Sequence, residues 1–238
     1  MIYSKKMPDK LFRNEHKFII DDISAELLKA KISTICMPDS HAGEDGFYDI
    51  RSLYFDSADD RFYRENLAGV SNRHKWRIRI YNSSDSRIAL EKKSTLKGLK
   101  HKDSCMVDRE RVMEFIDGEI SHREEDAPLL REFVTEAIEE NITPRVIVDY
   151  RRVPFVYPVG NVRVTVDSVI GASRNFEDFF SKDLNLFRAI PMGTNVLEVK
   201  FDEVLPHTIR EMINSASNLT PTAFSKYVTC FDAVRFMM

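Results

Sequence analysis

The chain has 238 residues, of which 43% are hydrophobic, and its 16 Phe and 8 Tyr can supply a large buried core, so overall disorder is excluded. Its 35 Lys and Arg against 38 Asp and Glu give a formal net charge of -3, which argues against the broad basic surface of a general nucleic-acid-binding protein. Any site for an anion must therefore arise from a local arrangement of charges.

Cysteine spacing and hydropathy indicate the cellular compartment in which the chain is expected. Cys36, Cys105 and Cys230 are scattered and form no CxxC pair, so neither a disulfide framework nor a zinc site is expected, and a reducing cytoplasm fits best. The N-terminal residues have no apolar signal region, and no later stretch approaches the roughly 18 apolar residues of a membrane span. We expect a soluble, cytoplasmic chain with no direct membrane insertion and no nucleic-acid partner.

The first quarter of the chain alternates between strand and helix patterns. Residues 13–20 carry β-forming side chains, and residues 24–35 have helical spacing with Ser24 as the expected N-cap. A second strand is expected over residues 48–57. It is followed by a short helix or turn over residues 59–69.

The middle of the chain is mainly of β type. Residues 74–82 and 87–94 predict an antiparallel hairpin, because the residues between them are turn-forming. A further strand is predicted over residues 99–111. Residues 127–141 then form a strongly amphipathic helical pattern.

The last part of the chain adds strands and then ends in helical patterns. Strands are predicted over residues 144–156 and 161–170, on either side of a turn, and over residues 195–203 after an irregular, Phe-rich stretch. Helices are predicted over residues 205–217 and 224–236.

Two properties of this pattern predict the architecture. No repeat, low-complexity tract or long linker interrupts the chain, so a single domain over residues 1–238 is expected. Eight short strands with hairpin-like spacing predict an α+β protein with an antiparallel barrel or strongly curved sheet, rather than a parallel fold.

Charged side chains recur at every second position of the predicted strands, and such positions share one face of a strand. Because the alternate positions Trp76, Ile78 and Ile80 are apolar, the charged face must look into solvent or into a wet cavity, which the pattern leaves open. Twelve basic residues belong to this set, eleven from the strand faces and Lys226 from the C-terminal motif: Arg13, Lys17, Lys75, Arg77, Arg79, Lys93, Lys100, Lys102, Arg152, Arg163, Lys200 and Lys226. The four acidic residues of these faces are Glu15, Glu91, Asp167 and Glu198.

Closely spaced like charges point to an anionic ligand. Lys75, Arg77 and Arg79 repel one another unless an anion or carboxylates lie between them. Phosphate suits such a site, because Arg presents a planar fork to its oxygens, Lys supplies mobile charge, and carboxylates can hold a divalent ion that bridges phosphates. The candidates for that ion are Glu198, Glu15 and Glu91. For each glutamate, a salt bridge with a neighbouring Lys or Arg is the alternative interpretation.

Several short motifs follow one another between Arg13 and Tyr227: RNEHKF, SLYFD, KWRIRIY, LEKK, YRRVPF with VRVTVD, LEVKFD and FSKY. In this order they resemble the VTC (vacuolar transporter chaperone) domain of the triphosphate tunnel metalloenzyme superfamily. The resemblance covers nearly the whole chain. It rests on the order of the motifs more than on any one of them.

The resemblance implies an antiparallel eight-stranded β-barrel tunnel with flanking helices, in which basic side chains grip a triphosphate or polyphosphate and a glutamate binds Mn or Mg. The best-understood VTC domains move the terminal phosphoryl group of ATP onto a growing polyphosphate chain, so ATP and polyphosphate or triphosphate are the expected partners. Charge on the transferred group would be neutralised by Arg77, Arg79, Arg152 and Arg163. Flanking phosphates would be held by Lys17, Lys93 and Lys226, with Lys100, Lys102 and Lys200 as further basic residues. The metal would be held by Glu198, with Glu15 and Glu91 as further candidates.

Two positions depart from the family pattern. The superfamily signature ExExK in the first strand begins here with Arg13, so its first glutamate is missing. The KFSKY motif of the eukaryotic polymerases reads AFSKY, with Ala223 in place of the first lysine. These departures weaken the expectation of a second metal site and of one phosphate contact.

Three functions remain open for such a cavity, beside a solvated sheet with an unrelated role. The first is a polyphosphate polymerase, which needs positioning and charge neutralisation rather than a protein nucleophile. The second is a hydrolase of triphosphate, polyphosphate or a nucleoside triphosphate, and the third is a polyphosphate-binding module without turnover. Transport of a polymer across a membrane would need a partner protein, and the oligomeric state is left open.

Overall fold

The computed structural model describes residues 13–236, in which eight long strands form one antiparallel sheet. They are β1 (Asn14–Asp21), β3 (Tyr48–Asp56), β4 (Asn72–Tyr81), β5 (Ser84–Leu96), β6 (Leu99–Met106), β7 (Thr143–Tyr157), β8 (Val162–Ser173) and β10 (Thr194–Phe201). Their order across the sheet is β1-β10-β8-β7-β3-β4-β5-β6. Three two-residue strands extend it, namely β2 (Met37–Pro38) on β7, β9 (Phe187–Arg188) on β8 and β11 (Thr220–Pro221) on β1.

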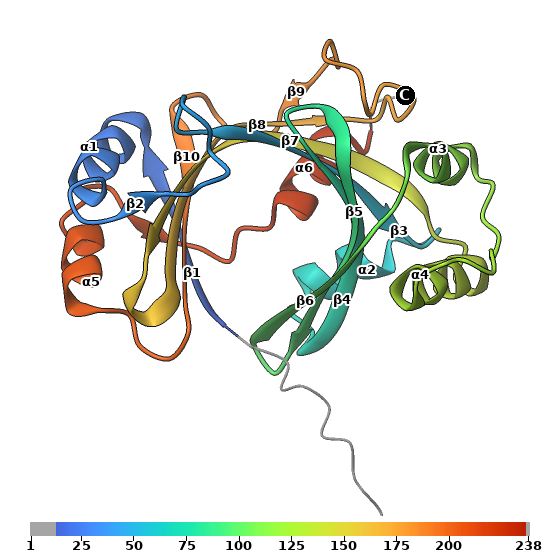
Figure 1. Ribbon diagram of the computed structural model, residues 1–238, viewed down its shortest axis with the longest axis horizontal. Coiled ribbons are helices and arrows are strands. Elements are labelled where there is room, and N and C mark those ends of the chain that lie inside the picture. The colour runs from blue at the N-terminus through green and yellow to red at the C-terminus, as the bar shows by residue number, and fades with distance from the viewer. Residues whose placement is uncertain (1–12, 237–238) are drawn as a thin grey trace, which may run out of the picture.

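The sheet curves around an interior space, so that its end strands β1 and β6 approach each other (Figure 1). They meet at an isolated antiparallel bridge between Arg13 and Lys100. Further along β1 the neighbouring place is taken by β11, and the next residue, Thr222, donates its backbone N–H to Lys17 O at 3.0 Å. The sheet is therefore not hydrogen-bonded continuously around a barrel. One bridge joins its ends, and the segment 220–225 lies along the rest of β1.

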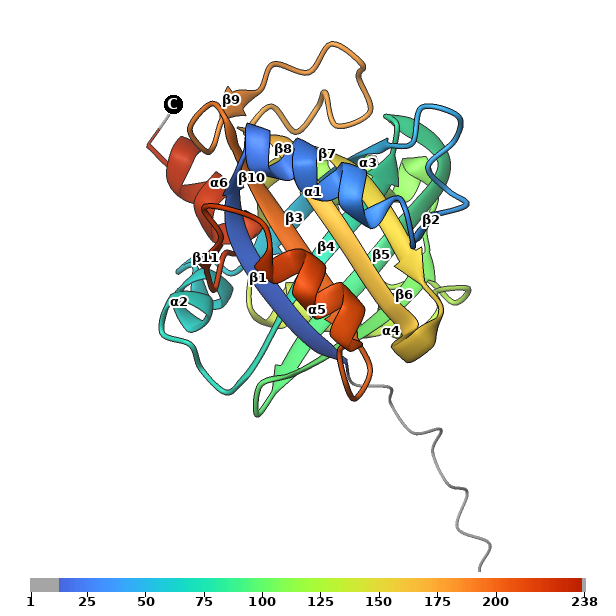
Figure 2. The same cartoon turned by 90° about the vertical axis from the view of Figure 1, so that its left-hand side faces the viewer.

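Helices cover the outer face of the sheet in two groups. Helices α1 (Asp22–Ile32) and α5 (His207–Asn214) pack over β1, β10 and β8 (Figure 2). Helices α3 (Arg109–Asp117) and α4 (Pro128–Glu139) pack over β3, β4 and β5. The apolar alternates Trp76, Ile78 and Ile80 are fully buried in this second group. Because side chains of a strand alternate, the charged residues between them must point to the interior.

Two further helices lie beside one end of the interior. Helix α6 (Lys226–Val234) packs against β7 and β8, and α2 (Arg61–Leu67) packs against α6 and β4. The buried Tyr227 of α6 donates its hydroxyl to Asp56 Oδ2 of β3 at 2.5 Å. Asp56 also accepts the backbone N–H groups of Phe62 and Tyr63, so one carboxylate joins β3, α2 and α6.

The predicted α+β fold, with an antiparallel sheet of eight long strands and flanking helices, is confirmed. Two local predictions were wrong. The strand expected over 99–111 ends at Met106, and α3 begins at Arg109 because Asp108 caps it by accepting the backbone N–H of Arg111. Helix α1 begins earlier than expected, because its N-cap is Asp21, which accepts the backbone N–H of Ser24. No helix within residues 13–236 has the length and apolar content needed to cross a bilayer.

Candidate functional site

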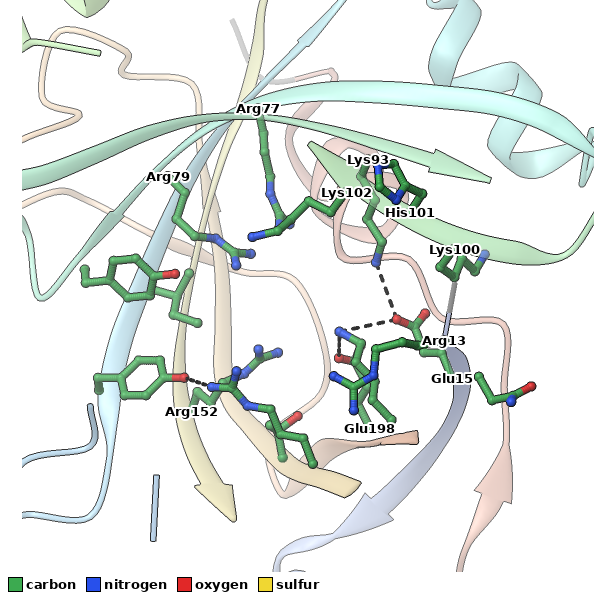
Figure 3. A pocket seen from close by; sticks show the side chains of 17 residues that line it. Arg13, Glu15, Arg77, Arg79, Lys93, Lys100, His101, Lys102, Arg152 and Glu198 are labelled. Atoms are coloured by element: carbon green, nitrogen blue, oxygen red, sulfur yellow. Dashed lines mark hydrogen bonds and ion pairs between the residues drawn. The ribbon is translucent and has the colours of Figure 1, made fainter. Parts of the chain in front are cut away.

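The interior of the sheet contains a cavity with three compartments that share lining residues. The wide chamber, of about 390 Å³, lies between Arg77 and Arg79 on one wall and Arg152 and Glu198 on the facing wall (Figure 3). The inner pocket, of about 60 Å³, lies next to the start of α6 and is lined by Lys226. The side pocket, also of about 60 Å³, lies along segment 223–225. We call the three together the interior cavity.

Among residues 13–236, thirteen Lys and Arg side chains line the interior cavity against two glutamates, so this lining is electropositive although the chain as a whole is slightly acidic. All twelve basic residues of the predicted faces are among them. The thirteenth, Arg73, continues the face of Lys75 by one further step of two residues and was missed. The alternating charges therefore face a common cavity and not the outer surface.

A buried ion-pair cluster fixes one wall of the wide chamber. Arg77 donates to Glu91 Oε2 through Nε at 2.7 Å and Nη2 at 2.6 Å, and Lys102 contacts Glu91 Oε1 at 2.7 Å. Arg77 Nη1 also donates to the hydroxyl of Tyr54 at 2.9 Å. Burial alone would raise the pKa of Glu91, but Arg77, Arg79 and Lys102 lower it far below its ordinary value. Glu91, a candidate metal ligand, is thus an ion-pair partner that orients Arg77.

Arg79, the next inward residue of β4, has only long contacts. Its guanidinium lies 3.9 Å from Glu91 Oε2, 3.4 Å from Ser52 Oγ and 3.3 Å from the hydroxyl of Tyr150. Its N–H groups are therefore more available to a ligand than those of Arg77.

A second cluster fixes the facing wall and the start of α6. Arg152 forms a two-pronged pair with Asp167, at 2.6 Å from Nε and 2.7 Å from Nη2, and Lys226 Nζ lies 2.5 Å from the same carboxylate. Burial alone would raise the pKa of Asp167, but Arg152 and Lys226 lower it. Burial alone would lower the pKa of Lys226, but Asp167 and Tyr150 raise it. Asp167 therefore keeps Arg152 and Lys226, two predicted phosphate-binding residues, in their charged forms.

Glu15 and Glu198 lie on the neighbouring strands β1 and β10 and share their lysine partners. Lys17 Nζ is 3.2 Å from Glu15 and 3.7 Å from Glu198, and Lys200 Nζ is 2.7 Å from Glu198 and 3.4 Å from Glu15. Lys93 reaches Glu15 from β5 at 3.5 Å. Although burial and their mutual repulsion act to raise them, the pKa values of both glutamates are lowered by these lysines. Both carboxylates are ionised at neutral pH.

This pair of glutamates fits one divalent ion that also takes oxygens from a ligand. Mg²⁺ is commonly bound by one or two carboxylates together with substrate phosphates, and Glu15 Oε2, which lies 3.4 Å from Lys200 Nζ and 3.5 Å from Lys93 Nζ, accepts no hydrogen bond in the described part of the chain. Within residues 13–236, no group of three or more His, Cys, Asp or Glu side chains could enclose a metal. The donor set is therefore suited to a metal that arrives with phosphate, and not to a closed protein site.

Arg163 is held at the edge of the wide chamber. Its Nη2 lies 2.8 Å from Asp39 Oδ2 and 2.7 Å from the hydroxyl of Tyr48. Lys100, on β6, contacts Thr95 Oγ1 at 3.3 Å close to its bridge with Arg13. Arg13 itself pairs at 3.0 Å with Asp202, which directly follows β10, the neighbouring strand of β1.

Neutral residues of the cavity were missed by a search for alternating charge. Tyr48, Ser52 and Tyr54 occupy alternate positions of β3 and contact Arg163, Arg79 and Arg77, respectively. The β3 face that they share also holds Ile50, so no alternation of charge or polarity marked it in the sequence. Thr165, between Arg163 and Asp167 on β8, has a buried hydroxyl with no hydrogen-bond partner among the described residues and lines the wide chamber. That hydroxyl is available to a ligand.

Comparison with known families gives one match over nearly the whole chain. The family model of the VTC domain matches residues 12–235. No curated protein matches the chain.

Solved structures share the fold at low sequence identity. A candidate adenylate cyclase from Bacillus halodurans superposes with a TM-score of 0.53 at 16% identity, over 95% of this chain and 97% of that chain. A candidate adenylyl cyclase from Hippeastrum, described as having a dominant triphosphatase activity, superposes with a TM-score of 0.55 at 14% identity, over 92% of this chain and 95% of that chain. At these identities the likeness establishes a common fold.

Proposed function

Because the chain belongs to the VTC domain family, we propose that it is a polyphosphate polymerase. It transfers the γ-phosphoryl group of ATP onto the end of a polyphosphate chain inside the interior cavity. The observation that carries the proposal is the lining of that cavity, within the described part of the chain, by thirteen cationic side chains and two carboxylates, Glu15 and Glu198, on neighbouring strands. A chain of phosphates supplies the negative charge that this lining lacks.

Positioning and charge neutralisation account for catalysis by this lining. A terminal phosphate oxygen of the acceptor attacks the γ-phosphorus, the bond from that phosphorus to the β,γ-bridging oxygen breaks, and ADP leaves with the bonding electron pair. Arg77 and Arg152 reach in from facing walls and are each held rigidly by a buried carboxylate. Arg79, whose described contacts are all 3.3 Å or longer, would turn its N–H groups to the equatorial oxygens of the transferred group. These fixed charges stabilise the transition state without reorganisation.

Lysines and glutamates have separate roles in the proposal. Lys17, Lys93 and Lys226 hold flanking phosphates, and Lys100, Lys102, Lys200 and Arg163 extend the basic lining of the wide chamber. Glu198 and Glu15 would hold Mn²⁺ or Mg²⁺ together with phosphate oxygens. Such an ion would supply positive charge that stabilises the phosphates of the substrate.

The direct test is a product assay. Purified protein with ATP, Mn²⁺ and a short polyphosphate primer should make long polyphosphate, detected by gel electrophoresis. Arg77→Ala should abolish it, whereas Arg87→Ala, which removes an exposed β5 arginine that lines no compartment, should not. A folded wild-type protein that makes no polymer would refute the proposal.

Hydrolysis is the second candidate, because the Hippeastrum neighbour is described as having a dominant triphosphatase activity. In that case water replaces the growing chain as the acceptor in the wide chamber. Release of orthophosphate from tripolyphosphate or ATP without any polymer would select hydrolysis. Tight binding of polyphosphate with neither product would select the binding module.

A further inference from the structure

The segment that joins β2 to β3 contacts one arginine of the wide chamber from both of its ends. Asp39 directly follows β2, and Tyr48 is the first residue of β3. Asp39 Oδ2 lies 2.8 Å from Nη2 of Arg163, and the same nitrogen donates to the hydroxyl of Tyr48 at 2.7 Å. Arg163 and Tyr48 line the wide chamber, whereas Asp39 lies behind them and lines none of the three compartments. Asp39 can therefore act on a ligand there only through Arg163 or through its charge.

Asp39 is itself held in place by its surroundings. Its Oδ1 accepts the backbone N–H of His41 at 2.9 Å and lies 2.8 Å from Nδ1 of the same residue. Its backbone N–H donates to the carbonyl oxygen of Pro154 in β7 at 3.3 Å, and its own carbonyl oxygen accepts the N–H of Ala42 at 2.9 Å. Burial alone would raise the pKa of Asp39, but the hydrogen bonds from His41 and the charge of Arg163 lower it. Oδ2 is therefore an ionised acceptor in a fixed position.

The ring of Tyr48 is equally constrained. It is buried and packs edge to face against Tyr81, with the ring centres 5.7 Å apart and an interplanar angle of 70°. Its backbone lies opposite Arg152 in the pairing of β3 with β7. Burial raises the pKa of Tyr48, so its hydroxyl stays neutral at physiological pH and accepts a hydrogen bond from Arg163.

These two contacts fix one end of the Arg163 guanidinium and leave the rest of it open. A guanidinium has five N–H donors, and the two on Nη2 are directed to Asp39 and Tyr48. Nε has no hydrogen-bond partner within residues 13–236, and no hydrogen bond from Nη1 is seen there either. The side chain is 36% exposed, so without its two anchors it would be free to change rotamer. Anchoring removes that freedom before a ligand arrives, which lowers the entropic cost of binding.

We propose that Asp39 and Tyr48 are positioning residues for Arg163, which they hold in the orientation in which its remaining N–H groups bind a phosphate in the wide chamber. Asp39 comes from a loop and Tyr48 is uncharged, so neither belongs to the alternating charges that predicted the cavity. The proposal rests on the proposed function for the identity of the ligand. It concerns binding and requires no turnover.

The test is a pair of double-mutant cycles on tripolyphosphate binding, measured by isothermal titration calorimetry with EDTA present. Arg163→Met alone should weaken binding about tenfold. Tyr48→Phe removes one anchor without a change of charge, so it should weaken binding about fivefold in the wild-type background. In the Arg163→Met background the same substitution should change binding less than twofold, because the residue that it positions is already absent.

The second cycle replaces Asp39 by Asn, which removes a negative charge as well as an anchor. The loss of repulsion between Asp39 and the anion is common to both backgrounds and therefore largely cancels in the cycle. Relative to Asp39, Asn should raise the dissociation constant at least fivefold more when Arg163 is present than in the Arg163→Met background. Asp45→Asn is the matched control, because Asp45 is exposed, lies in the same segment and lines no compartment. Its effect should be the same in both backgrounds.

The cycles separate positioning from the other roles of these residues. Equal effects of Tyr48→Phe in the two backgrounds would mean that Tyr48 contacts the ligand itself or only supports the fold, and would overturn its positioning role. Equal effects of Asp39→Asn would leave only its charge and overturn the role of Asp39. Thermal unfolding should show every variant to be folded at the temperature of the titrations. A protein that shows both couplings but makes no polymer refutes only the polymerase proposal.

Discussion

Asp167 joins Arg152 and Lys226, and its replacement by Asn isolates what that carboxylate contributes. The side chain of Asp167 is fully buried and lies 2.6 and 2.7 Å from two nitrogens of Arg152 and 2.5 Å from Lys226 Nζ. Asn has nearly the same shape but no charge, so Asp167→Asn leaves two buried cations without their counter-ion. Breaking a buried ion pair in this way costs about 3–5 kcal/mol.

That loss should leave the protein folded, because domains are stable by about 5–15 kcal/mol. The assay is urea unfolding followed by circular dichroism, with the free energy of unfolding obtained by linear extrapolation. Asp49→Asn is the matched control. It removes the partner of Arg151, the neighbour of Arg152 on β7, from a pair whose side chains are 40% and 45% exposed. A pair so exposed contributes less than about 1 kcal/mol.

Tripolyphosphate provides the second arm of the same experiment. In Asp167→Asn the ligand would supply the negative charge that Arg152 and Lys226 have lost, so it should raise the free energy of unfolding of the variant more than that of the wild type. A loss below about 1 kcal/mol without ligand, or equal stabilisation of both proteins by ligand, would refute this account. The pKa of Asp167 is lowered in the folded state, so its contribution is present above pH ~4 and is lost as the pH falls through the folded value.

Three other predictions concern groups outside that cluster. Burial lowers the pKa of Lys93 to about 7, whereas the unfolded chain keeps this proton until pH ~10.4. Ligand-free protein in EDTA should therefore gain stability between pH 7 and 9, by at most ~1.4 kcal/mol per pH unit. Tripolyphosphate should flatten that slope in thermal unfolding scans. Thr165→Val should weaken tripolyphosphate binding about tenfold in calorimetry without lowering stability, and Thr165→Ser should not, because only the hydroxyl is lost. Tyr227→Phe should cost about 1–3 kcal/mol in urea unfolding, because it leaves the buried Asp56 without one donor.

The fold could be predicted from the sequence because period and burial agree in most strands. The apolar alternates Trp76, Ile78 and Ile80 required a hydrophobic layer on one face, and the charged residues between them then had to face the other side. The junction after β6 was predicted wrongly, because residues 99–111 were assigned to one strand. Asp108 was a visible N-cap, and Val112 and Phe115 have the spacing of one helical face, both buried in the structure.

The sequence predicted which residues line the cavity better than it predicted which of them form ion pairs with one another. Alternation located Arg77, Arg152 and Glu91 on inward faces, but the partner of each depends on which strands become neighbours. Arg152 faces Asp167 because β7 pairs with β8 in that register, and Arg77 faces Glu91 because β4 pairs with β5. Both pairs lie across hairpins that the sequence predicted, so what the pattern left open was the register, which the turn geometry and the buried face of each strand fix. For this reason Glu91 was a metal candidate in the sequence, whereas the structure shows it bound to Arg77.

The cationic side chains of the interior cavity divide into those with and those without a close carboxylate partner. This division explains how the cavity can be rigid and still bind an anion. Arg77, Arg152 and Lys226 are locked by buried carboxylates, which fix their positions and keep their charges. Among residues 13–236, Arg79 has a carboxylate contact only at 3.9 Å and Lys75 has none within 4.0 Å, so a bound anion would stabilise the charged form of Lys75, whose pKa is lowered, and would balance Arg79. If every cation were paired, the cavity would be stable but would attract an anion weakly; if none were, repulsion would spread the strands apart. We therefore expect this unbalanced remainder to favour a polyanion, because the described lining carries many more positive than negative side chains.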